Sequence, residues 1–190
     1  MHYWNRSMEK ITNTRIECIL SDPYLFEIYK HFGMSYLRRS SVFHGLGPFL
    51  KDNKIKGKVC LEIGTWNGLT AAILSRHFDL VVSLDIAHNK EKYAVIHHLG
   101  LKNIKCIDIE DNIEKSKVIK KYNFDFAYLD GNHENDTLLD WGLVKSCGRV
   151  LFHEAWPHQK PVWELVESLP QYQVIHGVDG IALWDRSRGA

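Results

Sequence analysis

The sequence lacks several features that would each have pointed directly to a class of protein. Charge of neither sign dominates, because 24 lysine and arginine residues face 23 acidic ones and leave a net charge of +1. Such a balance gives no electrostatic footprint for nucleic acid or for an anionic membrane. No apolar run reaches about 18 residues, the length of a membrane-spanning helix, and residues 1 to 10 do not resemble a signal peptide. We therefore expect a cytoplasmic protein without a nucleic-acid or membrane partner.

The spacing of the cysteines does not suggest a disulfide framework or a zinc site. They are Cys18, Cys60, Cys106 and Cys147, and no two of them make a C-x-x-C pair. Two fall on expected core strands, so free buried thiols are favoured over a disulfide or a zinc site. A G-x-x-x-x-G-K-[ST] loop is also missing, which leaves a P-loop nucleotidase unsupported.

A strand, turn and helix pattern at residues 59 to 85 is the most informative part of the sequence. An apolar run at 59 to 63 is followed by Gly64 and Gly68, which would let the chain turn tightly beneath a ligand. A second apolar run ends at Asp85, about 20 residues after the first glycine. An acid at the tip of a neighbouring parallel strand is well placed to accept hydrogen bonds from ribose hydroxyls. The pattern therefore predicts a nucleoside site.

The spacing of the glycines disfavours a dinucleotide. A G-x-G-x-x-G turn needs its second glycine so that the backbone can approach a pyrophosphate, but Trp66 takes that position and Leu69 takes the third. The residues instead read E-x-G-x-x-x-G from Glu62 to Gly68. This spacing leaves room for one adenosine that carries a smaller, zwitterionic tail.

Strands and helices alternate along most of the chain. Strands are expected at 59 to 63, 80 to 84, 104 to 107, 124 to 129, 150 to 152, 172 to 176 and 180 to 184, and helices at 69 to 78, 90 to 98, 111 to 121, 134 to 146 and 161 to 168. Such alternation predicts an α/β fold with a doubly wound, mostly parallel sheet and helices on both faces. Residues 1 to 56 are expected to form a helical segment, either a substrate cap or an interface with a second subunit. Residues 57 to 190 are expected to form the nucleoside-binding domain of the same globular unit.

Three motifs in order resemble the class I S-adenosylmethionine-dependent methyltransferases. Besides the glycine turn, residues 124 to 133 (FDFAYLDGNH) are similar to the D-G-D-H segment that follows the fourth strand in a subgroup of small-molecule O-methyltransferases. Residues 148 to 154 (GRVLFHE) are similar to the fifth-strand segment of that subgroup. The resemblance implies a seven-stranded Rossmann-like sheet in the order 3-2-1-4-5-7-6 with an antiparallel last strand. It also implies S-adenosyl-L-methionine as cofactor and a hydroxyl of a small molecule or sugar as methyl acceptor.

The residues expected at the cofactor lie at the carboxyl ends of the strands, where ligands bind in sheets of this type. They are Glu62, Gly64, Thr65, Trp66, Asn67, Gly68, Asp85, Ile86, Asp108, Glu110 and Asp130. Trp66 either packs in the core or lines the methionine end of the cofactor. The resemblance implies that one of Asp108, Glu110 and Asp111 lies near the adenine amino group.

Methyl transfer to a hydroxyl requires an aligned acceptor oxygen and a route for its proton. In metal-dependent relatives, carboxylates after strands four and five hold a divalent ion. That role carries onto Asp130, His153 and Glu154, with Mg²⁺ or Mn²⁺ as the ion. The second acid of D-G-D can act as base in those relatives, but Asn132 stands in its place here. We hypothesise that His133 is the general base and that Asp130 orients it or the substrate.

Other functions remain open at this point. An N-methyltransferase would need no strong base, so an amide at position 132 would be unremarkable. A non-catalytic nucleoside-binding module would keep Gly64, Gly68 and Asp85 but lack an acceptor site. A nicotinamide oxidoreductase fits the glycine spacing least well.

Overall fold

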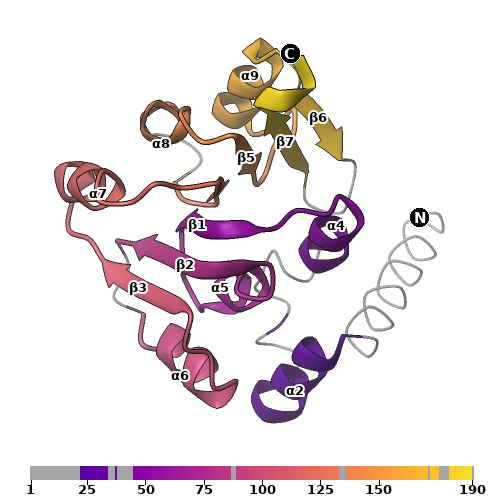
Figure 1. The fold of residues 1–190 in the computed structure, drawn as a ribbon, viewed down its shortest axis with the longest axis vertical. Coiled ribbons are helices and arrows are strands. Elements are labelled where there is room, and N and C mark those ends of the chain that lie inside the picture. The colour runs from indigo at the N-terminus through magenta and orange to yellow at the C-terminus, as the bar shows by residue number, and fades with distance from the viewer. Residues whose placement is uncertain are drawn as a thin grey trace, which may run out of the picture.

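The computed structural model describes residues 22–33, 37, 45–86, 89–132, 136–170, 172–175 and 180–189. Within these residues, strands form one central sheet with helices on both faces (Figure 1). The strands are β1 (Gly57–Ile63), β2 (Phe78–Asp85), β3 (Ile104–Asp108), β4 (Phe126–Leu129), β5 (Arg149–Phe152), β6 (Tyr172–Ile175) and β7 (Ile181–Asp185). The helices are α2 (Pro23–Phe32), α4 (Leu46–Asp52), α5 (Leu69–Leu74), α6 (Glu91–His98), α7 (Asn112–Ile119), α8 (Thr137–Val144), α9 (Lys160–Ser168) and the 3-10 helix η2 (Arg186–Gly189).

The strand order confirms the predicted fold. The sheet runs β3-β2-β1-β4-β5-β7-β6, with β1 to β5 paired in parallel and β7 antiparallel to both β5 and β6. The order reverses between β1 and β4, because the chain leaves β3 at one edge and returns to the middle of the sheet. A doubly wound sheet binds ligands outside the carboxyl ends of the strands at this point.

Two apolar clusters cover the two faces of the sheet. Cys60 and Phe126 belong to the cluster beneath α2, α4 and α5, while Leu61 and Ala127 belong to the cluster beneath α7, α8 and α9. Successive strand residues therefore alternate between the clusters, and both faces are buried. This explains the near-continuous apolar runs that made the parallel strands predictable.

The expected helix at 69 to 78 is shorter than predicted. Helix α5 ends at Leu74 and β2 begins at Phe78. The Asn103 side chain donates to the carbonyl oxygens of Ser75 at 2.8 Å and of Phe78 at 3.0 Å. The ring of Phe78 stacks on Phe126 with centroids 5.3 Å apart. Because of these contacts, Phe78 and the residues after it belong to β2 and not to α5. The helical pattern of the sequence could not reveal such contacts.

Strand β4 also begins later than expected, at Phe126 instead of residue 124. The carboxylate of Asp125 accepts hydrogen bonds from the backbone amides of Lys58 at 2.6 Å and Val59 at 3.0 Å. The amide of Asp125 also donates to the carbonyl oxygen of Val59 at 2.9 Å, so the side chain adds to the backbone contact with β1 just before this strand begins. Helix α8 is described from Thr137 onward, so the predicted start at 134 lies outside the described residues.

The described part of the N-terminal segment lies along the amino ends of the strands. Asp22 caps α2 by accepting from the amides of Tyr24 and Leu25, and its carboxylate contacts Arg76, just before β2, at 2.7 Å. At the other end of α2, His31 stacks on His98, the last residue of α6, with ring centroids 3.9 Å apart. None of the described helices has the length and apolar character needed to cross a membrane.

Candidate active site

The turn after β1 is closed so tightly that its first residue must be glycine. Gly64 has a φ of +100°, and a Cβ placed there would lie 2.0 Å from the backbone oxygen of Asp130. The amide of Asp130 donates to Ile63 at 2.8 Å, and the amide of Gly64 donates to Leu84 at 2.8 Å. The ends of β1, β2 and β4 are thereby fixed against one another.

The remainder of the turn is held by its own polar side chains. Thr65 and Asn67 are buried, with Thr65 Oγ1 2.6 Å from Ser83 Oγ and Asn67 Oδ1 accepting from the amide of Leu69 at 3.2 Å. Gly68 has a φ of +80° and begins α5, and a Cβ there would meet the backbone of Lys92 at 3.0 Å. The backbone of residues 64 to 68 is therefore rigid before any ligand binds.

Trp66 does not pack in the core. Its side chain is 43% exposed, and its backbone has a left-handed φ of +40°. Its amide donates to the carboxylate of Asp85 at 2.5 Å. Asp85, at the end of β2, is nearly buried by this contact. The structure thus brings the predicted acid directly against the predicted turn.

Glu62 lies beneath the turn and is completely buried. Ser83 donates a hydrogen bond to Glu62 Oε2, whereas Oε1 has no hydrogen-bond partner among the described residues. Burial, together with the negative charges of Asp130 and Asp85, raises the pKa of Glu62 from 4.5 to about 8 against the opposing hydrogen bond from Ser83. At neutral pH this carboxyl group is therefore largely protonated.

The acids after β3 separate into two roles. The carboxylate of Asp108 forms an ion pair with the fully buried Lys92 of α6. Asp111 caps α7 by accepting from the amide of Glu114 at 2.7 Å, and Glu114 in turn accepts from the amide of Glu110 at 2.8 Å. Asp108 thus stays at the sheet edge, whereas the carboxylates of Asp111 and Glu114 accept from backbone amides at the start of α7.

A narrow slot opens between these elements at the carboxyl ends of the strands. Residues from four strand ends and two helices line it: Ile63, Gly64, Leu84, Asp85, Ile86, Ile109, Lys115, Gly131, Asn132 and Asp136. Ile86, at 60% exposure, forms an apolar wall at its mouth, and Ile109 forms a buried one. Its lining combines apolar walls with a few polar groups, as small-molecule sites do, but its volume is about 40 Å³, well below the roughly 300–1,000 Å³ of a typical site.

A second, smaller pocket adjoins the slot beside β4 and β5. It is lined by Leu129, Gly131, Asn132, Thr137, Asp140, Phe152, His153 and Val162. His153 Nδ1 lies 2.7 Å from Asp130 Oδ1, and the His153 side chain is 10% exposed. Burial disfavours the charged imidazole, but the neighbouring carboxylate of Asp130 outweighs it and raises the pKa of His153 above its ordinary value. The pair offers an oriented imidazole next to the slot.

The residues predicted as metal ligands are not brought together as a set of three. Asp130 and His153 are adjacent, but the carboxylate of Glu154 accepts from the Gln159 side chain at 2.8 Å. In the part of the chain that the structure describes, no three His, Cys, Asp or Glu side chains are arranged to hold a metal ion. The donor set therefore does not fit the predicted divalent ion. His133, the predicted base, lies outside the described residues.

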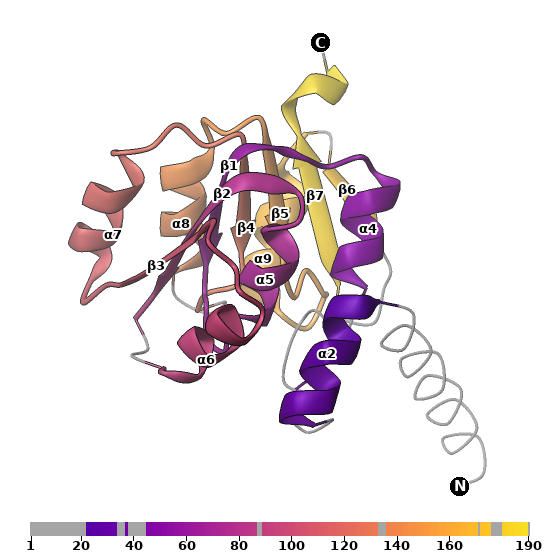
Figure 2. The same ribbon diagram turned by 60° about the horizontal axis from the view of Figure 1, so that its bottom comes forward.

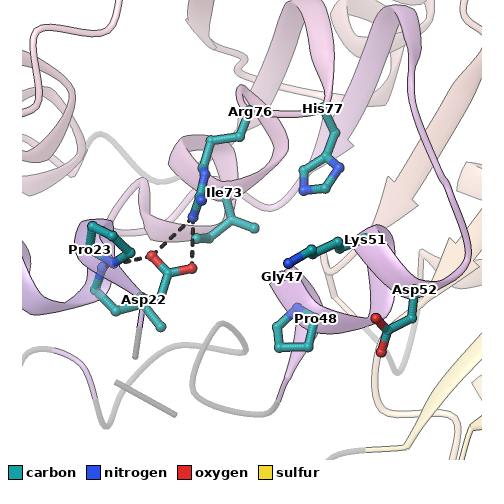
Figure 3. Close-up of a pocket in the computed structure, with 10 residues that line it drawn as sticks. Asp22, Pro23, Gly47, Pro48, Lys51, Asp52, Ile73, Arg76 and His77 are labelled. Carbon is teal, nitrogen blue, oxygen red and sulfur yellow. Dashed lines mark hydrogen bonds and ion pairs between the residues drawn. The ribbon is translucent and has the colours of Figure 1, made fainter. Parts of the chain in front are cut away.

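A larger cavity, of about 430 Å³, lies at the opposite edge of the sheet (Figure 3). It is lined by α2, α4 and the end of α5, where Lys51, Arg76 and His77 surround it. Arg76 is already paired with Asp22 there. Because Arg76 and His77 precede β2 while Asp85 ends it, this cavity is separate from the slot. The described part of the N-terminal segment therefore borders this cavity, and the slot is lined by none of its residues.

Two buried lysines near the site were not identified from the sequence. Lys92 of α6 and Lys115 of α7 both lie on the apolar side of their helices, Lys92 three residues before the buried Val95, and Lys115 three before the buried Val118. A charge at such a position is unusual for an amphipathic helix. That periodicity is the sequence signal that could have found them.

Solved structures, among them an O-methyltransferase and an rRNA methylase, share this fold. An O-methyltransferase from Bacillus cereus in complex with S-adenosylhomocysteine (SAH) aligns with a TM-score of 0.57 and 15% identity, over 94% of this chain and 89% of that one. Cofactor-bound Rv0187 from MTB aligns with a TM-score of 0.60 and 17% identity over 74% and 79% of the two chains. An rRNA methylase from Streptococcus thermophilus aligns with a TM-score of 0.57 and 15% identity over 73% and 92%.

The sequence matches no protein-family model and no curated protein. At these identities the structural likeness establishes only the fold, a Rossmann-like α/β sheet that these solved structures also have. The cofactor and the acceptor must be argued from the site.

Proposed function

We propose that the chain is an S-adenosylmethionine-dependent methyltransferase that acts on a hydroxyl of a small molecule or sugar. The observation that carries this proposal is the closed turn between β1 and α5, where Gly64 touches Asp130 and the amide of Trp66 meets Asp85. The turn stands at the strand-order reversal, in a fold shared with a methyltransferase solved in complex with SAH. A nucleoside with a short tail suits a turn that lacks the glycine needed beside a pyrophosphate.

The residues of the slot fit this cofactor in two respects. The carboxylate of Asp85 can accept hydrogen bonds from ribose hydroxyls, since an ionised carboxylate has about four acceptor positions. Ile86 and Ile109 line the slot with apolar surface that suits the faces of a base.

The chemistry assigns the protein two tasks. Bound S-adenosylmethionine supplies an electrophilic methyl group on a sulfonium, and the protein holds the acceptor oxygen in line with it. The acceptor proton passes to a histidine that Asp130 orients. His153 is the candidate supported by a contact with Asp130, and His133 remains the candidate predicted from the sequence.

The cofactor is tested by calorimetric titration with S-adenosylmethionine and with SAH. We expect both to bind the wild type and binding to be lost in Asp85→Ala, because ribose recognition and the support of the Trp66 amide are removed together. Asp79→Ala is the matched control, since Asp79 is exposed at the amino end of the same strand. Absence of binding to the wild type would refute the proposed function.

The base is tested after a screen of hydroxyl and amine acceptors with labelled cofactor has supplied a substrate. We expect His153→Gln to lower kcat by roughly 10² to 10⁴ while the Kd of S-adenosylmethionine stays unchanged. His97→Gln, on the exposed side of α6, serves as control. Loss of kcat in His133→Ala but not in His153→Gln would instead assign the base to His133.

Asn132 favours one alternative, methyl transfer to nitrogen. Asn132 lines both the slot and the adjoining pocket. Its side-chain amide would therefore lie between the cofactor in the slot and the acceptor in the pocket. An amide can position an amine but cannot take its proton. Amine acceptors in the same screen, with turnover insensitive to either histidine, would support this reaction. Cofactor binding without transfer to any acceptor would support a nucleoside-binding module.

A further inference from the structure

A buried ion pair separates the slot from the adjoining pocket. Lys115 of α7 and Asp140 of α8 lie with Nζ and Oδ1 2.7 Å apart, and each side chain is 4% exposed. The two helices lie side by side on one face of the sheet (Figure 2). Lys115 lines the slot, and Asp140 lines the adjoining pocket. The pair is therefore in contact with both cavities.

The ammonium of Lys115 is held close to the floor of the slot. Its partner Asp140 packs against Gly131, because a Cβ at Gly131 would lie 3.5 Å from Asp140 Oδ2. Gly131 itself lines the slot. Asp140 thus holds the lysine head group close to Gly131, one of the residues that line the slot.

Lysine has more hydrogen-bonding capacity than this ion pair uses. An ammonium group carries three N–H donors and no acceptor, and Asp140 takes one donor. A buried donor without an acceptor costs about 1–3 kcal/mol, so a ligand that supplies an acceptor here is favoured. The edge of adenine presents ring nitrogens with lone pairs, which accept hydrogen bonds.

We propose that Lys115 is a specificity-determining residue that donates a hydrogen bond to a ring nitrogen of the cofactor's adenine, with Asp140 as its positioning partner. This inference rests on the proposed function, because it assumes that adenosine occupies the slot. It differs from the expectation drawn from the resemblance, in which an acid meets the adenine amino group. Asp108, the acid that stays at the sheet edge, is instead paired with Lys92.

The first test needs no substitution in the protein. Calorimetry compares SAH with analogues in which CH replaces one adenine nitrogen, at position 1, 3 or 7. We expect one of the three analogues to bind the wild type roughly 10- to 100-fold more weakly than SAH, as for a lost hydrogen bond to a charged group. Equal affinities for SAH and all three analogues would overturn the proposal for Lys115 but leave the proposed cofactor intact. Failure of SAH itself to bind would overturn both.

The second test links the lost affinity to the lysine. In Lys115→Met we expect SAH to bind more weakly by the same factor, and the discrimination between SAH and the sensitive analogue to disappear. Lys117→Met, on the exposed side of α7, should preserve both. Discrimination that persists in Lys115→Met would show that the lysine acts only structurally.

A double substitution controls for the possibility that the single variant does not fold. Removing one partner of a buried ion pair is strongly destabilising, whereas replacing both with apolar residues is often neutral. Lys115→Met combined with Asp140→Leu therefore serves as the folded variant when thermal unfolding shows the single variant to be disrupted. The same loss of discrimination is expected in it, and unchanged discrimination would contradict the proposal.

Discussion

At the scale of single residues, Glu62 makes the stability of the protein depend on pH. It is fully buried beneath the turn, and the pKa of its carboxyl group is raised to about 8, mainly by burial. The folded protein therefore retains a proton that the unfolded chain releases above its ordinary pKa of 4.5. A raised carboxyl pKa makes the folded state less stable as pH increases, the opposite of the usual effect of an ion-paired acid.

We predict that Glu62→Gln removes this dependence. Below pH 4.5 the acid is protonated in both folded and unfolded states, so the variant and the wild type should differ little. Between pH 4.5 and about 8 the variant should become progressively more stable than the wild type, by up to about 5 kcal/mol for a shift of this size. Urea unfolding without cofactor at several pH values measures the difference. Glu167→Gln, exposed on α9, is the control and should show no such trend.

Some residues of the site could be identified from the sequence, whereas the two buried lysines were missed. Gly64, Gly68 and Asp85 were identifiable because backbone geometry and strand ends require particular residue types at fixed spacing. Lys92 and Lys115 belong to a common exposed type, and only their tertiary partners make them part of the site. The contact of His153 with Asp130 likewise depends on how β4 and β5 are paired.

At the scale of elements, α2 shows how a helix can stabilise the fold from the edge opposite the slot. Asp22 accepts hydrogen bonds from two amides of its first turn and holds Arg76 at 2.7 Å. Arg76 lies over the ring of Tyr24, 4.7 Å from its centroid. One carboxylate thereby caps the helix and joins it to the segment between α5 and β2.

Asp22→Ala should lower the free energy of unfolding by roughly 1–2 kcal/mol, since both the cap and the ion pair are lost. Its cofactor affinity should not change, because Asp22 lies at the amino edge. Glu27→Ala is the comparison on the same helix: Glu27 and Lys30 form a pair with both side chains 51% exposed, which should contribute little. Thermal unfolding and SAH titration measure the two effects, and equal destabilisation by both variants would contradict the role assigned to Asp22.

Element boundaries were less predictable than element types. Apolar runs buried on both faces identified the parallel strands, yet Phe78 joined β2 and residues 124 and 125 were left out of β4. The deciding groups were Asn103 and Asp125, whose side chains bind backbone of other elements. Contacts of this kind depend on the whole fold and leave no local pattern in the sequence.

At the scale of the whole molecule, the topology was predictable as soon as the resemblance was recognised. Alternation alone predicts a doubly wound sheet, while the position of β7 between β5 and β6 came from the resemblance. The identity of the methyl acceptor depends instead on the shape and polarity of the smaller pocket. The smaller pocket is shaped by side chains of β4, β5, α8 and α9, and its size and polarity are not encoded by any motif.

The contact between Gly64 and Asp130 also sets an order of events during synthesis on the ribosome. β1 is paired with β2 on one side and with β4 on the other, although β4 is made much later. A nascent chain that ends before Phe126 contains the glycine turn and Asp85 but leaves one side of β1 as an open strand edge, which invites wrong pairing. The slot is therefore completed late, and we expect a ligand that fits it to bind only chains in which β4 has paired with β1.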